Sequence, residues 1–160
     1  MKKLRMLLWP MVLILAAGSW SPAPAKDSDD IEKVLVAVVE AFRTGDYETM
    51  EKYYDKDCVV VSSASYSPPV VGWENLYKIY QATHARLTSA EMVRENTIIR
   101  WEGKIAWVTY QWKFFQMVGD KPSAFQGHTT LVLEKKRRRW RIMHNHTSAL
   151  PAPEDAAPAS

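Results

Sequence analysis

The sequence is short of the features that define several large classes of protein. It has a single cysteine, Cys58, which excludes an internal disulfide framework. It has only 6 Gly and 9 Pro beside 47% hydrophobic residues, which excludes collagenous and intrinsically disordered chains. A chain of 160 residues is long enough for one domain with a hydrophobic core and leaves little room for a second domain.

The chain also lacks a real excess of charge. Lys and Arg number 21 against 18 Asp and Glu, and the surplus equals the contribution of Lys2, Lys3 and Arg5. These three lie in residues 1–25, which contain no acidic residue, so the rest of the chain is neutral. Nucleic-acid-binding domains are usually strongly basic. We therefore expect no nucleic-acid partner.

The basic start is followed by an apolar run over residues 6–17, which is short for a membrane span. Ala23-Pro24-Ala25 then fits the small-residue pattern of a secretory cleavage site. We expect residues 1–25 to be a signal peptide and Lys26 to begin a periplasmic or secreted protein, with an uncleaved N-terminal anchor as the alternative. No later stretch is long and apolar enough to span a membrane.

The first half of the chain has helical periodicity. Apolar residues recur at helical spacing from Ile31 to Phe42, after Ser28 or Asp29 as a candidate cap. Gly45 should end this helix, and Asp46 should cap a short second helix. A third helix is expected after Gly72. Its apolar stripe consists of Trp73, Leu76, Tyr77, Tyr80, His84 and Leu87.

The second half has the pattern of strands. We expect a strand over residues 59–63, with Cys58 buried at its start, and four more over residues 91–101, 105–118, 124–133 and 140–148. The Ala- and Pro-rich residues 149–160 should form a disordered tail. Helices followed by a strand meander indicate an α+β fold. We expect a cone, in which a curved antiparallel sheet wraps around a long helix and leaves an apolar pocket at the open end.

Four phrases of the sequence are similar to a known superfamily: residues 44–48, 53–57, 127–133 and 140–148. With the order of the elements, they resemble the nuclear transport factor 2-like superfamily and its SnoaL-like domain, here over residues 26–148. The last phrase is similar to the association domain of calcium/calmodulin-dependent kinase and its bacterial relatives. The resemblance implies the cone fold. It leaves function open, because the fold hosts isomerases, cyclases, dehydratases, binding modules and oligomerisation domains.

The best-known chemistry of that superfamily is not expected here. In ketosteroid isomerase-like members, a carboxylate base, a tyrosine and a carboxylic acid stand at positions that correspond to Ser62, Val38 and Thr130. None of these residues can take those roles. The arginine of the kinase association domain corresponds to Thr147, so its anion-binding chemistry is not expected either.

Histidines on the last two strands are the candidate catalytic residues. His144 and His146 should project from one face of a strand, and strand pairing should bring His128 near them. Such a group could act as a general base or bind Zn²⁺. No HxxxH, Cys–His or carboxylate partner supports a metal, so we expect none. The alternative is a structural role, with one imidazole packed near Trp140 and another at the pocket rim or a dimer surface.

The face that these histidines occupy depends on the regularity of the last strand. A single β-bulge would exchange His144 and His146 for Met143, Asn145 and Thr147 at the pocket.

Aromatic residues on the third helix and on strand 105–118 are the candidate pocket lining, and core and dimer packing is the alternative. The expected ligand-binding residues are Tyr54, Trp73, Tyr77, Tyr110, Trp112 and Asn145. Large apolar residues occupy both faces of strand 105–118, so a second subunit could cover the outer face. We expect a homodimer formed through the sheet.

Three functions remain open at this point. The first is binding of a small apolar molecule without a cofactor. The second is an isomerase, cyclase or dehydratase that uses a pocket histidine, with Tyr54 or Tyr110 as a proton donor. The third is an oligomerisation module whose pocket is filled by side chains. The basic run Lys135–Arg139, with Arg141, is either a solvated turn or a contact for anionic lipid or polysaccharide.

Overall fold

A computed structural model describes residues 25–62 and 67–151, and every structural statement below refers to these two ranges. The helices are α1 (Ala25–Thr44), α2 (Tyr47–Glu51) and α3 (Trp73–His84). The strands are β1 (Tyr54–Ser62), β2 (Val70–Val71), β3 (Ser89–Glu102), β4 (Ile105–Val118), β5 (Lys121–Lys136) and β6 (Arg139–Pro151). No helix within these ranges is long and apolar enough to span a bilayer.

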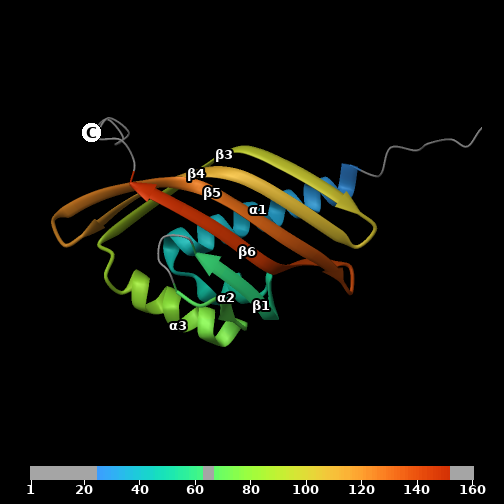
Figure 1. Cartoon of the computed structure of the whole chain (residues 1–160), viewed down its shortest axis with the longest axis horizontal. Helices are drawn as coiled ribbons and strands as arrows, with labels where there is room; N and C mark the ends of the chain where they lie inside the picture. Colours follow the sequence, from blue (N-terminus) through green and yellow to red (C-terminus); the bar gives the residue numbers. More distant parts are fainter. Residues whose placement is uncertain (1–24, 63–66, 152–160) are drawn as a thin grey trace, which may run out of the picture.

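The six strands form one curved, unclosed sheet in the order β2-β1-β6-β5-β4-β3. The long strands β3 to β6 form the expected antiparallel meander, and α1 lies along their concave side (Figure 1). The α+β cone is thus confirmed, with one correction to the sheet. Strand β1 pairs with β6 in parallel, because the chain crosses from β1 to the far edge of the sheet through β2 and α3 before the meander begins.

Helix α1 supplies the side of the core that faces the sheet. Its buried residues Ile31, Leu35 and Val38 follow the helical spacing that the sequence displays. The expected cap is wrong, because α1 begins at Ala25 and places Ser28 and Asp29 inside the helix.

The end of α1 and the start of α2 agree with the sequence. Gly45 has a φ of +73°, a left-handed value that ends α1, and Asp46 caps α2 by accepting a hydrogen bond from the Thr49 N–H at 3.0 Å. Cys58, in β1, is fully buried as expected, and burial raises the pKa of its thiol to about 11.

The strands of the meander are longer than the sequence pattern indicates, except for β4, whose limits match. Strand β6 continues to Pro151, so Ala149, Leu150 and Pro151 pair with β5 and do not belong to a disordered tail. The sequence pattern ends too early because strand pairing joins backbone groups, which do not depend on the side-chain pattern; residues 149–151 pair with residues 125–127 of β5. The rest of the expected tail, residues 152–160, lies outside the described residues, as do residues 1–24 of the expected signal peptide.

The basic run forms the hairpin turn between β5 and β6. Arg137 and Arg138 both have positive φ values, 47° and 69°, a combination that normally selects Asn-Gly. Two lysines of the run make ion pairs: Lys135 with Asp27 at the start of α1, and Lys136 with Asp55 at 2.7 Å. Residues 137–139 are exposed, so the turn presents arginine side chains to solvent.

Candidate functional site

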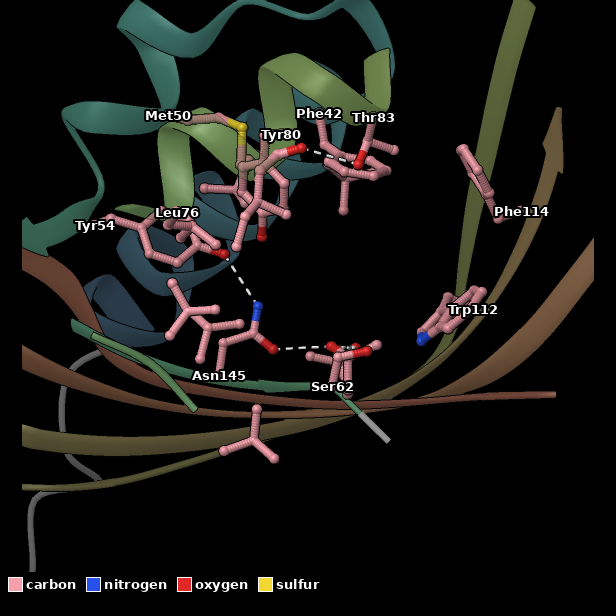
Figure 2. Close-up of a pocket in the computed structure, with 18 of the residues that line it drawn as sticks. Phe42, Met50, Tyr54, Ser62, Leu76, Tyr80, Thr83, Trp112, Phe114 and Asn145 are labelled. Atoms are coloured by element: carbon pink, nitrogen blue, oxygen red, sulfur yellow. Dashed lines mark hydrogen bonds between the residues drawn. The ribbon is translucent and has the colours of Figure 1, made fainter. Parts of the chain in front are cut away.

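A pocket of about 420 Å³ opens between α1, α3 and the concave face of the sheet (Figure 2). This volume falls in the usual range for small-molecule sites. Most of its wall is apolar, and a few hydroxyl groups and one amide interrupt it. The lining residues are Val38, Val39, Phe42, Met50, Tyr54, Val60, Val61, Ser62, Ser67, Pro68, Val70, Leu76, Ile79, Tyr80, Thr83, Met92, Tyr110, Trp112, Phe114, Thr129, Asn145 and Thr147.

The polar groups of the pocket form a connected chain along the sheet. Asn145 donates from Nδ2 to the Tyr54 hydroxyl at 3.0 Å and accepts from the Thr147 hydroxyl at 2.8 Å. The hydroxyls of Thr147 and Thr129 are 2.8 Å apart, and Thr129 donates because the Thr147 proton is directed to Asn145. Figure 2 shows the links through Asn145 at the floor of the pocket. The chain therefore has a defined direction from Thr129 to Tyr54, and the Tyr54 hydroxyl in turn neighbours that of Tyr80.

Burial keeps the pocket tyrosines protonated. It raises the pKa of Tyr80 to about 12, and it raises the pKa values of Tyr54 and Tyr110 well above the usual 10. Desolvation disfavours a phenolate, so these hydroxyls stay neutral at physiological pH. They can donate hydrogen bonds, but they cannot act as proton-abstracting bases.

The described lining contains no Asp, Glu, His, Lys or Arg side chain. The sequence between Ser62 and Ser67 adds none, because residues 63–66 are Ser, Ala, Ser and Tyr. Outside the lining, the Arg94 guanidinium lies 5.8 Å from the centre of the Tyr110 ring and pairs with Glu32 of α1. The described lining is thus electrically neutral, and the cation beside Tyr110 is already paired.

The structure places the three candidate histidines away from this pocket. Opposite Val132 and Leu133, β6 presents His144 and Ile142, so Met143 is an extra residue in the ladder. This β-bulge turns Ile142 and Asn145 toward the concave side. His144, His146 and His128 are absent from the lining. The bulge explains the two histidines of β6, whereas His128 faces outward because Thr129, Leu131 and Leu133 are the buried residues of β5.

The three histidines lie on the convex face of β5 and β6, where His128 is opposite Ser148 and His146 is opposite Thr130. His128 pairs with Gln111, with 3.1 Å between their Nε2 atoms, and His128 and His146 are exposed. Within the described ranges, no group of three or more His, Cys, Asp or Glu side chains could hold a metal ion.

The predicted ligand-binding residues divide into two groups. Tyr54, Tyr110, Trp112 and Asn145 line the pocket. Trp73 and Tyr77 do not, because α3 turns them away from it: the Trp73 ring packs on Tyr54 with 5.5 Å between centroids, and Tyr77 packs on Tyr47 at 5.4 Å. Trp73 therefore packs behind Tyr54, a residue of the pocket wall, and Tyr77 packs outside the lining.

The lining also contains Tyr80, which belongs to the aromatic stripe expected on the third helix, and Thr147, which the sequence places at the pocket only if the last strand has a β-bulge. Thr129 is the pocket residue that the sequence analysis missed. Thr129 and Thr147 are directly opposite each other on β5 and β6. A signal for Thr129 was present, because it alternates with Leu131 and Leu133, both buried, on the concave side of β5. A polar residue in such a series indicates a buried hydrogen-bonding position.

The half-open cone, with its pocket between helix and sheet, can now be compared with known protein families. The sequence profile of the SnoaL-like domain family matches residues 31–153, so the chain belongs to that family. No curated protein matches the sequence significantly.

Solved structures with the same fold have low sequence identity to this chain. One is the nuclear transport factor 2-like superfamily protein of Salmonella enterica, at 16% identity and a TM-score of 0.71, covering 86% of this chain and 100% of that one. Another, from Novosphingobium aromaticivorans, is named a "putative scytalone dehydratase". It has 12% identity and a TM-score of 0.73, and the match covers 85% of this chain and 92% of that one. A third, from the same organism, is named a "putative aromatic ring hydroxylase", with 16% identity, a TM-score of 0.72 and coverage of 85% of this chain and 100% of that one. At these identities the similarity establishes the fold.

Proposed function

We propose that the protein binds a small, largely apolar molecule in the pocket between α1, α3 and the sheet. The observation that carries this proposal is the 420 Å³ pocket, whose described lining is uncharged and holds a chain of hydrogen-bonded side chains. An apolar wall supplies affinity, and a few fixed polar groups orient a ligand. The proposed ligand therefore combines an apolar skeleton with a small polar group.

The same geometry favours binding over acid–base catalysis. Two of the similar structures are named after a dehydratase and a hydroxylase. Proton transfer needs a group whose pKa lies near the working pH. The described lining offers tyrosines with raised pKa values, and the histidines lie outside it.

Blocking the rim of the pocket should abolish binding without unfolding the protein. Thr83 is exposed and lines the pocket from α3, so Thr83→Trp should place an indole in the opening and leave the core unchanged. We expect the affinity for N-phenyl-1-naphthylamine, a neutral fluorescent probe, to fall by about tenfold or more. The matched control is Lys78→Trp, on an exposed part of the same helix outside the lining. Equal probe affinity in the two variants would refute a ligand site here.

We also propose that two subunits associate through the convex face of the sheet. Ile98, Ile105 and Trp107 are 44–51% exposed on neighbouring strands of that face. Clustered large apolar side chains of this kind are typical of contact surfaces. Trp107→Lys should convert a dimer to a monomer in sedimentation equilibrium, whereas Lys121→Ala, at the other end of the sheet, should leave the dimer intact. A monomeric wild-type protein would contradict this proposal.

Export is the third element of the proposed function. The cleavage pattern ends at Ala25, where α1 begins, so removal of residues 1–25 leaves Asp27 and its ion pair with Lys135 in place. N-terminal sequencing of the protein from its own cells should begin at Lys26. A mature protein that still begins at Met1 would be evidence against the signal peptide.

A further inference from the structure

The pocket contains a buried hydrogen-bond donor that has no acceptor. Trp112 lies on β4 and is 7% exposed, and its indole Nε1 has no hydrogen-bond partner. Within the described residues, only Trp140 shares this property. The Trp140 indole lies close enough to the Asp27 carboxylate to lower its pKa, together with the larger effect of Lys135. Trp112 has no such neighbour, and an orphaned buried donor is rare in folded proteins.

The orientation of the Trp112 ring is built into the sheet. Gly127 is directly opposite Trp112 on β5, and a Cβ atom there would lie 2.8 Å from the ring atom Cζ2. Only glycine leaves room for the indole to lie across that strand. Figure 2 shows the indole nitrogen turned toward the interior of the pocket, on the side that faces the hydrogen-bonded chain.

The opposite wall also presents donors. Asn145 donates to the Tyr54 oxygen, so Tyr54 keeps its own proton for donation. Tyr54 donates that proton to the neighbouring Tyr80 oxygen, so the Tyr80 hydroxyl keeps its own proton for donation. Because the tyrosines stay protonated, the polar surface of the pocket is rich in donors and contains no ionised group.

We propose that the ligand is an uncharged carbonyl compound whose oxygen accepts a hydrogen bond from Trp112 Nε1. This inference rests on the proposed function and adds the polar chemistry of the ligand. A carbonyl oxygen accepts a hydrogen bond without requiring a counter-charge. A carboxylate would lose its hydration in the pocket and find no cation in the lining to compensate. An ammonium group cannot accept at all, and a hydrocarbon would leave the indole N–H unpaired.

A series of probes with one two-ring skeleton tests the proposal. The probes are tetralin, 1-tetralone and 1-aminotetralin, each measured by displacement of N-phenyl-1-naphthylamine from the wild-type protein. We expect 1-tetralone to bind about tenfold more tightly than tetralin, which is the usual effect of satisfying one buried donor. The amine should bind no better than tetralin. Trp112→Phe should remove the preference for the ketone and keep tetralin binding, and Trp140→Phe, the matched loss of the other buried indole N–H, should keep the preference.

A second readout needs no variant and so does not depend on the folding of Trp112→Phe. In ¹⁵N-labelled wild-type protein, 1-tetralone should move one indole N–H resonance downfield, and tetralin should not. Equal affinity of the two probes, with no such shift, would overturn the carbonyl proposal and leave the binding function standing. If no probe bound, including N-phenyl-1-naphthylamine, the binding function and the carbonyl proposal would both be refuted.

Discussion

Gly127→Ala should unfold the protein or lower its free energy of unfolding by about 3 kcal/mol or more, as severe overpacking does. The added Cβ would lie 1.9 Å from the carbonyl oxygen of Ser148 on β6, as well as against the Trp112 ring. A backbone atom in a paired strand cannot rotate out of the way, so β5 and β6 must separate locally. Chemical denaturation followed by circular dichroism measures the loss.

Gly103→Ala is the matched control. Gly103 has a φ of +57°, and a Cβ there would meet nothing within 4 Å. The control carries only the left-handed backbone penalty, about 1 kcal/mol. If the two alanine variants were equally stable, the close approach of β5 and β6 at Gly127 would be wrong.

Asn145→Ala should lower the free energy of unfolding by about 2–3 kcal/mol, because it leaves the buried Tyr54 hydroxyl and the half-buried Thr147 hydroxyl each short of a partner. Asn145 is 8% exposed and joins Tyr54 to Thr147. The substitution interrupts the chain of hydrogen bonds from Thr129 to Tyr54 at the pocket floor. Thermal and urea denaturation should both report the loss, and probe binding should weaken in the folded fraction.

A double-mutant cycle separates this effect from simple loss of volume. Tyr54→Phe removes the hydroxyl that accepts from Asn145 and keeps the ring that packs on Trp73. In that background, Asn145→Ala should cost about 1 kcal/mol less than in the wild type. Additive losses would show that the Asn145–Tyr54 hydrogen bond contributes nothing to stability.

The fold could be predicted from the sequence because its signals are local and repetitive. The stripe from Ile31 to Phe42 places α1, and the alternation between Ile105 and Val118 places β4 within one residue of its observed limits. The parallel pairing of β1 with β6 was not predictable in this way. It joins Val60 to Asn145, and no pattern in the sequence around either residue indicates that the two strands pair.

The site was predicted in part, and one residue accounts for most of the error. Met143 is the extra residue in β6. Each side chain of β6 after Met143 therefore points to the face opposite the one that a regular alternation would give it. Asn145 enters the pocket for this reason, and the histidines beside it leave it. A bulge has no strong sequence signature, because it arises from the fit between two strands. The positions of Tyr54, Tyr110 and Trp112 were predictable, since buried aromatics tolerate few other environments.

The parallel pairing of β1 with β6 also decides when this part of the sheet can form. Strand β1 has β2 on one side and β6 on the other, and β6 is the last of the described elements along the chain. Until residues near 147 emerge, β1 exposes an unpaired edge and the pocket has no floor. Contacts so distant along the chain form slowly. The pocket of a newly made chain is therefore completed only after β6 has been synthesised.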